Sequence, residues 1–346
     1  MILDLVNHRP TIKNERWKYT SLRALDQFPF LTAAKQSFDP VMIPALPFET
    51  AGQVVYMNGH LASELSIETN VPANTTLEHP IDCVFIATDA AKHCALNVEQ
   101  VIEIGEHASA SIVIRTIGNT SEQYLSNISH AIHAGKHSNV SIYFIQTQSD
   151  KAFHIEQCLI NAQEGAMVNV NVLSLGAQLA RTDVNVNYNG QRAQSNVYGI
   201  YHVNQKQHVD FHFDAEHHAP HCATQQHAKG CVDDEARAVF NGRVMVPKHA
   251  TQSFSEQSHH GLLLSKRARI DAKPELEIDC DDVQCRHGAT VGALRQDAIF
   301  YLMSRGMDEK SAKSMLELAH VVSLLDKVSH QGIKEYMLDL LRRKYG

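Results

Sequence analysis

The stretch AMVNVNVLSLGAQLARTDVNVNYNGQRAQSNVYGIYHV, residues 166–203, decides the fold class. Polar and apolar residues alternate in three runs, at 166–175, 182–190 and 195–203. Alternation with a period of two puts successive side chains on opposite faces of a β-strand, and valine and tyrosine favour that conformation. We therefore expect short strands here, and similar runs extend over about residues 52–285.

These runs recur at a drifting interval. Val113, Ile142, Val170 and Val197 occupy equivalent places in four of them, at steps of 29, 28 and 27 residues. A repeat of this length that is filled with strands is typical of a β-solenoid, in which each coil buries its inner face against its neighbours. An antiparallel β-sandwich stays open as the alternative, because the region also contains three Asn-Gly pairs, which are typical of hairpin turns.

The segments on either side of the β-rich region are predicted to be helical. Residues 14–28, NERWKYTSLRALDQF, space their apolar residues as a short amphipathic helix does, and a proline-rich linker follows. Near the other end, Asp308 is expected to cap a helix that runs through Leu325, and a last helix is expected over 331–344. The predicted divisions are an N-terminal helical segment with its linker, a β-core and a C-terminal helical domain, at residues 1–50, 51–287 and 288–346.

Composition narrows the functional class. The 346 residues include 31 basic and 38 acidic side chains, so a general attraction to nucleic acid or to an anionic membrane is not expected. We find no signal-peptide pattern and no apolar run of membrane-spanning length, which predicts a cytoplasmic protein and disfavours a secreted β-helix that acts on polysaccharide. The seven cysteines are irregularly spaced and do not form a disulfide framework.

Histidines are concentrated between residues 208 and 227. This segment predicts either a polar ladder on one strand face or, as the alternative function, a metal-dependent enzyme. Its spacing matches neither a zinc finger nor the HExxH motif. The candidate ligands are His208, His212, His217, His218, His221, Cys222 and His227.

Cys285 and His287 form the sharpest candidate site. On an extended segment, residues i and i+2 point the same way, so a thiolate and an imidazole could face one iron or zinc ion. Two ligands do not complete a metal site, and the pair could equally be the last inward positions of a core. Arg181, which precedes Asp183 on one strand face, is interpreted as structural bracing.

Longer stretches resemble a known family. Residues 237–292, which include CRHGAT at 285–290, resemble the SufB/SufD family of iron-sulfur cluster assembly proteins, and SufD more than SufB. RWKYTSL at 16–22 and LGAQLARTDVNVNYNG at 175–190 also match. Segment 67–105 fits the pattern poorly, which leaves open whether the early coils are missing. Arg286 stands where a small residue is usual. Its charge could lower the pKa of Cys285 or bind an anion, or the side chain could simply point outward.

The resemblance implies a mainly β protein, with a right-handed parallel β-helix core between N- and C-terminal helical segments. It also implies a non-catalytic scaffold that pairs with a SufB-like subunit through the β-helices. His287, with Cys285 beside it, would hold a nascent cluster shared with SufB. A SufC-like ABC ATPase would dock on the C-terminal helices, at positions that correspond to Phe300, Tyr301, Leu302, Arg305 and Gly306.

The same resemblance bears on cofactors and assembly. The iron-sulfur cluster would be transient and present only in the complex, so the isolated chain is expected to hold no cofactor. Reduced FAD is associated with such complexes, although we find no flavin fingerprint in this sequence. Without a SufB-like partner, the strand edge that pairs with it is expected to allow a homodimer.

Overall fold

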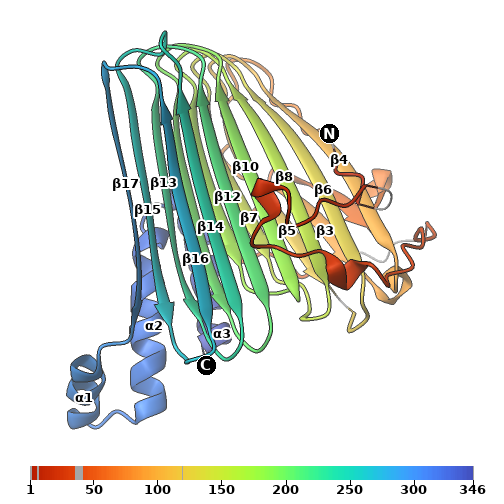
Figure 1. The fold of residues 1–346 in the computed structure, drawn as a ribbon. Coiled ribbons are helices and arrows are strands. Elements are labelled where there is room, and N and C mark those ends of the chain that lie inside the picture. Colours follow the sequence, from red (N-terminus) through yellow and green to blue (C-terminus); the bar gives the residue numbers. More distant parts are fainter. Residues whose placement is uncertain (1, 6–7, 36–41, 119, 346) are drawn as a thin grey trace.

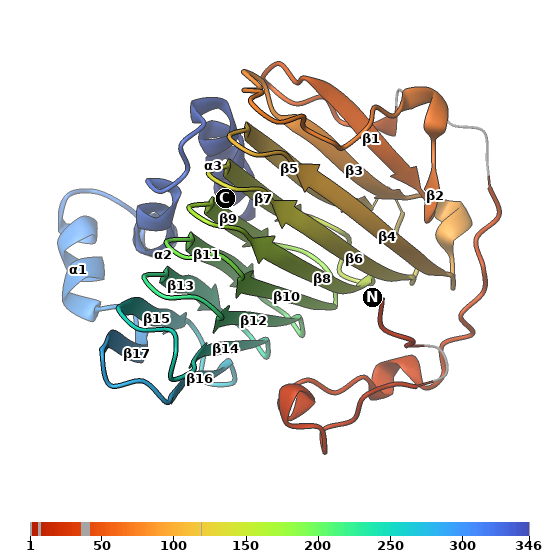
Figure 2. The same cartoon turned by 90° about the horizontal axis from the view of Figure 1, so that it is seen from above.

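The computed structural model describes residues 2–5, 8–35, 42–118 and 120–345, and it shows a parallel β-solenoid (Figures 1 and 2). From β3 onward, successive strands alternate between a ten-stranded and a seven-stranded sheet, so each coil contributes one strand to each. Neighbouring strands are parallel, apart from the antiparallel pairing of β1 with β2. The predicted solenoid is confirmed, and the antiparallel sandwich is excluded.

Apart from β1, β2 and β3 at the first end, the strands are eight to eleven residues long. Those of the ten-stranded sheet are β1 Gly52–Met57, β2 His60–Leu61, β3 Ile81–Ala87, β5 Ser109–Gly118, β7 Asn139–Gln146, β9 Met167–Ser174, β11 Gln194–Val203, β13 Ala223–Val232, β15 Ser253–Leu263 and β17 Val283–Ala293. Those of the seven-stranded sheet are β4 Ala95–Ile104, β6 Leu125–Ala134, β8 Phe153–Ala162, β10 Leu179–Tyr188, β12 His208–His217, β14 Arg237–Val246 and β16 Arg269–Ile278. Because β3 and β4 lie within 67–105, that segment does form coil strands.

The register supports most of the predicted repeat. Ile142, Val170 and Val197 are direct neighbours on β7, β9 and β11. Val113 is out of place by one residue, because Ile112 is the residue that pairs with Ile142. Val113 instead points outward, where the C-terminal helices bury it. The outer face of β5 therefore also carries a buried apolar residue, and alternation alone does not show which residues face inward.

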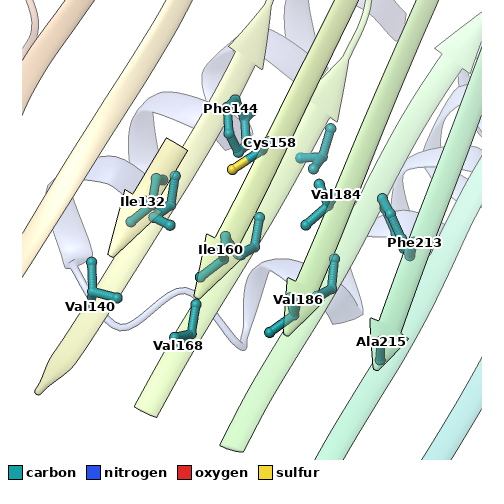
Figure 3. Close-up of a cluster of buried hydrophobic side chains, with 14 of the residues drawn as sticks. Ile132, Val140, Phe144, Cys158, Ile160, Val168, Val184, Val186, Phe213 and Ala215 are labelled. Carbon is teal, nitrogen blue, oxygen red and sulfur yellow. The ribbon is translucent and has the colours of Figure 1, made fainter. Parts of the chain in front are cut away.

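The main core fills the space between the two sheets. Inward side chains from strands of both sheets meet there, as Figure 3 shows for Phe144 of β7, Cys158 and Ile160 of β8, and Val184 of β10. All four are at most 1% exposed. Each coil covers the apolar inner face of the next, which is how a solenoid builds one continuous core.

One corner of the coil repeats the same backbone geometry. A residue with φ between 54° and 65° occupies this corner at His107, His137, Gly165, Arg192 and His221. Each of them donates its backbone N–H to a carbonyl in the corner of the following coil, at 2.8–3.2 Å. The corners are therefore stacked by hydrogen bonds, as the strands are, and four of these five positions tolerate a side chain in the left-handed region.

The N-terminal segment does not form the expected helix over residues 14–28. Residues 14–28 form only two single-turn 3-10 helices, η1 Glu15–Trp17 and η2 Arg23–Leu25. The apolar side chains of the segment pack instead on the outer face of the seven-stranded sheet, against β6, β8 and β10. In Figure 1 this segment crosses that face. The amphipathic spacing was real, but contacts with the sheet, rather than helical hydrogen bonds, determine the backbone.

Arg181 fixes this segment to the sheet. Its guanidinium is fully buried and donates to Asp183 at 2.8 and 3.0 Å and to Asp210 at 2.9 Å. It also donates to the backbone carbonyl of Arg16 at 2.7 Å, and the ring of Trp17 lies 3.9 Å from it. The predicted bracing role of Arg181 is confirmed, and the braced element is the N-terminal segment.

The C-terminal residues form three helices, α1 Gln296–Ser304, α2 Glu309–Leu325 and α3 Gln331–Tyr345. Asp308 caps α2 as predicted, because its side chain accepts a hydrogen bond from the Ser311 backbone. Helices α2 and α3 pack on the outer face of the ten-stranded sheet, whereas α1 stands away from the solenoid (Figure 2).

Replacing Arg181 with alanine is expected to lower the free energy of unfolding by about 3–5 kcal/mol, because two buried carboxylates lose their cation. Urea denaturation followed by circular dichroism measures this change. Arg243→Ala is the matched control on the same sheet face, where Arg243 pairs with the partly exposed Glu216 and Glu277. Its expected cost is about 0–1 kcal/mol. Equal losses in the two variants would contradict the role assigned to Arg181.

Candidate functional site

The two ends of the solenoid differ. At the first end, β2 pairs with β1, and bridges at Leu31, Val71 and Thr76 add backbone pairing to the early strands. At the last end, β17 pairs only with β15 and β16 only with β14 among the described strands. The outer edges of β16 and β17 therefore expose backbone groups that another strand can bind.

The last coil is incompletely covered. The inward residues of β16, which include Ile270, Leu276 and Ile278, are only partly buried against the main core. Pro274 also lies in this strand, and proline is tolerated in sheets mainly at edges. This end of the solenoid is thus a half-buried apolar surface, bordered by the unpaired outer edges of β16 and β17.

Cys285 and His287 lie on β17 and face this open end. In the register they pair with Ser255 and Gln257 of β15, whose side chains are buried inside the solenoid. Both site residues therefore point to the inner side, as the i, i+2 spacing predicted. Cys285 is half-buried against the core and His287 is exposed, so neither is enclosed within this chain.

Arg286 points to the opposite side of β17. Its guanidinium donates to Glu256 of β15 at 2.7 Å on the outer surface. The pKa of Cys285 is raised by burial, and by its proximity to Cys280, with a smaller opposing effect from a backbone hydrogen bond of Ser255. Of the alternatives considered for Arg286, the structure supports the one in which the side chain points outward.

Three polar residues form a layer beneath the site. Ser255, Gln257 and His259 are successive inward residues of β15, and each is at most 1% exposed. The ring of His259 accepts or donates a hydrogen bond at 2.8 Å with the hydroxyl of Tyr201. Burial lowers the pKa of His259 to about 3, so its ring is neutral at physiological pH.

No local sequence pattern singled out this polar layer. Ser255, Gln257 and His259 stand in SFSEQSHHG, a mostly polar stretch that begins at residue 253 and lacks the polar and apolar alternation of the other strands. Their relation to Cys285 and His287 depends on a pairing between residues 30 apart in the chain. Only the register of β15 with β17 reveals it.

The His-rich segment does not converge on one site. His208 and His212 lie on the outer face of the seven-stranded sheet, His217 lies inside the solenoid, and His227 lies on the outer face of the ten-stranded sheet. His212 contacts Asp210 at 3.1 Å, which matches the predicted polar ladder. Within the described residues, no group of three or more His, Cys, Asp or Glu side chains is arranged to hold a metal ion.

Helix α1 presents an apolar surface to solvent. Phe300 and Tyr301 are 73% and 57% exposed, whereas Ile299 is buried. Arg305 lies 5.4 Å from the centre of the Tyr301 ring, and Gly306 ends the helix with φ of 93°. Leu302 is partly buried. In both views α1 lies at the same end of the molecule as β15 and β17 (Figures 1 and 2).

Comparisons with known proteins agree on one family. Residues 85–320 match the family model described as the SufBD core domain of the SUF system of FeS cluster assembly. A SufBD family protein of Synechocystis is 27% identical over 92% of this chain and 84% of its own length. SufD of Escherichia coli is 24% identical over 95% and 88%, and the chloroplastic protein ABCI7 of Arabidopsis thaliana is 26% identical over 81% and 60%.

The helices of the described segments are too short or too polar to cross a membrane.

Alkylation of Cys285 is expected to be slow at pH 7 and to accelerate through pH 9, because the thiolate is the reactive form and burial raises the pKa of this thiol. Iodoacetamide labelling followed by peptide mass spectrometry measures the rate at each pH. The other six cysteines are buried and serve as internal references. A rate for Cys285 that is already maximal at pH 7 would mean that its thiol is ionised there.

Proposed function

The chain belongs to the SufBD family of the SUF system and is like SufD, and from this premise we propose that it is a non-catalytic scaffold subunit for nascent iron-sulfur clusters. A role in iron-sulfur cluster assembly follows from the family. The finer role places the cluster at an interface with a SufB-like subunit. The main support is that Cys285 and His287 lie on β17, whose outer edge pairs with no described strand. These two residues alone do not complete a ligand set.

The partner surface is the last coil. Its half-buried apolar residues and its two strand edges suit a partner that also ends in a β-coil, because strand pairing would continue both sheets. A partner docked there would bring its own ligands next to Cys285 and His287. The cluster is cargo that passes through this interface, and thiolate and imidazole are ligands that iron accepts. Without a SufB-like partner, a second copy of the chain would pair through the same edges.

A second surface would receive a SufC-like ABC ATPase. Helix α1 projects from the body and exposes the rings of Phe300 and Tyr301. Aromatic side chains commonly anchor protein–protein interfaces. Leu302, Arg305 and Gly306 complete the proposed docking region. Because α1 follows β17 closely in the chain and lies at the same end of the molecule, an ATPase bound there could act on the cluster interface. Reduced FAD as the electron source and a cytoplasmic location stay predictions.

Replacing His287 with alanine is expected to reduce the iron and sulfide content of the co-expressed SufB–SufC complex several-fold while leaving the fold intact, because the side chain is exposed and contributes no packing. Iron and acid-labile sulfide are measured on the purified complex, with circular dichroism as the test of folding. His218→Ala, at an exposed histidine near Glu216, is the control. Full cluster content in the His287 variant would remove it from the proposed ligands.

Replacing Phe300 with aspartate is expected to abolish co-purification of the ATPase without loss of the SufB-like subunit, because a charge replaces the most exposed apolar ring of α1. Affinity purification of the tagged chain and quantitation of both partners gives the result. Val101→Asp, at a 54% exposed apolar residue of β4, is the control. Retention of the ATPase by the Phe300 variant would show that it docks elsewhere.

A further inference from the structure

The polar layer beneath Cys285 and His287 has unmet hydrogen-bonding capacity. Ser255 Oγ, Gln257 Oε1 and His259 Nδ1 are buried and have no hydrogen-bond partner. A buried polar atom without a partner loses its hydration without compensation, so three in succession on one strand face require a reason. They lie one strand away from the proposed cluster ligands.

The amide of Gln257 is held at one end and free at the other. Its Nε2 donates to Gln226 Oε1 at 3.0 Å and lies 3.4 Å from the backbone carbonyl of Glu275. These two acceptors fix which end of the amide carries the nitrogen, and they leave Oε1 as an acceptor without a donor. Gln257 is 1% exposed, so bulk water does not satisfy it.

The donor that this oxygen lacks is available on His287. His287 is the direct register neighbour of Gln257, and adjacent strands are about 4.8 Å apart. Both side chains face the inner side of the sheet, and the exposed imidazole of His287 is free to turn toward the amide. A metal-binding histidine generally donates its second ring N–H to a carbonyl or carboxylate, which fixes the tautomer and orientation of the ring.

We propose that Gln257 is a positioning residue whose Oε1 accepts the N–H of His287 and so presents the other ring nitrogen of His287 to the incoming iron. The inference rests on the proposed function, in which His287 is a cluster ligand. It adds a specific requirement, namely that the neighbouring coil sets the tautomer of His287 before a partner or a cluster arrives. Gln226 then acts one coil further in, by holding the Gln257 amide in place.

The test reads the tautomer directly in the full chain without metal. Nitrogen-15 NMR of histidine-labelled protein at pH 8 distinguishes the two neutral tautomers, and the His287 signals are those absent from His287→Ala. The wild type is expected to show one tautomer. Gln257→Met removes the acceptor at similar volume and is expected to give a mixture, whereas Gln257→Glu keeps an acceptor and is expected to restore a single form.

Two further variants keep the experiment decisive. Gln226→Met frees the Gln257 amide without changing Gln257 itself, and it is expected to give a mixture even where Gln257→Met fails to fold. Gln284→Met, on the outward face of β17, is the matched control and leaves the tautomer unchanged. An identical tautomer ratio in the wild type, Gln257→Met and Gln226→Met overturns the proposal.

A second readout links the tautomer to metal binding. In the co-purified complex, Gln257→Met is expected to weaken Co²⁺ binding at the interface by about 10–100-fold, and Gln257→Glu to recover it. A Co²⁺ affinity that is unchanged in Gln257→Met overturns the positioning role. If His287→Ala assembles full clusters while the tautomer still depends on Gln257, the proposed ligand role fails and the hydrogen bond stands, so the two failures are distinguishable.

Discussion

Backbone pairing between successive coils is the constraint on which the rest of the structure depends. Each strand bonds to the equivalent strands before and after it, and residues in the same place therefore stack in columns through the molecule. The residues of an inward column, which can be apolar, polar or glycine, then determine what the interior contains along that line. The ladder ends at β16 and β17, whose outer edges pair with no further strand among the described residues. The proposed site lies on β17, at the end of the solenoid where strand pairing stops.

Local patterns predicted the features that depend on nearby residues. The alternation predicted strands, and its repeat interval predicted the solenoid. Asp308 predicted the start of α2, and the end of the alternation placed Cys285 and His287 near the last coil. Features that depend on distant residues were missed. Residues 14–28 carry a helical spacing, yet the partners of Trp17 and Thr20 are Arg181 and Asp210, far along the chain. No window of the sequence contains both halves of those contacts.

The candidate site shows the same limit. The i, i+2 spacing was enough to predict that Cys285 and His287 share a face. It was not enough to show that the face looks onto Ser255, Gln257 and His259, because coil lengths vary and the register follows only from the structure. From Ile112 to His287 the equivalent positions are separated by 30, 28, 27, 29, 31 and 30 residues. A drift of this size is enough to move any extrapolated position to the opposite face of a strand.

The outer faces of the two sheets are covered by opposite ends of the chain, and the N-terminal cover has a consequence for how the protein is made. Glu15, Arg16 and Trp17 contact Lys273, Asp214 and Arg181 respectively. A ribosome delivers the N-terminal segment first and these partners much later. Apolar side chains of the segment can pack on β6 and β8 early, but these three contacts cannot form until β10, β12 and β16 exist. Solenoid coils need only their neighbours and can form in order as they emerge. Docking of the first residues is thus expected to be a late event in biosynthesis, and it would seal the seven-stranded sheet only after nearly all of its coils are in place.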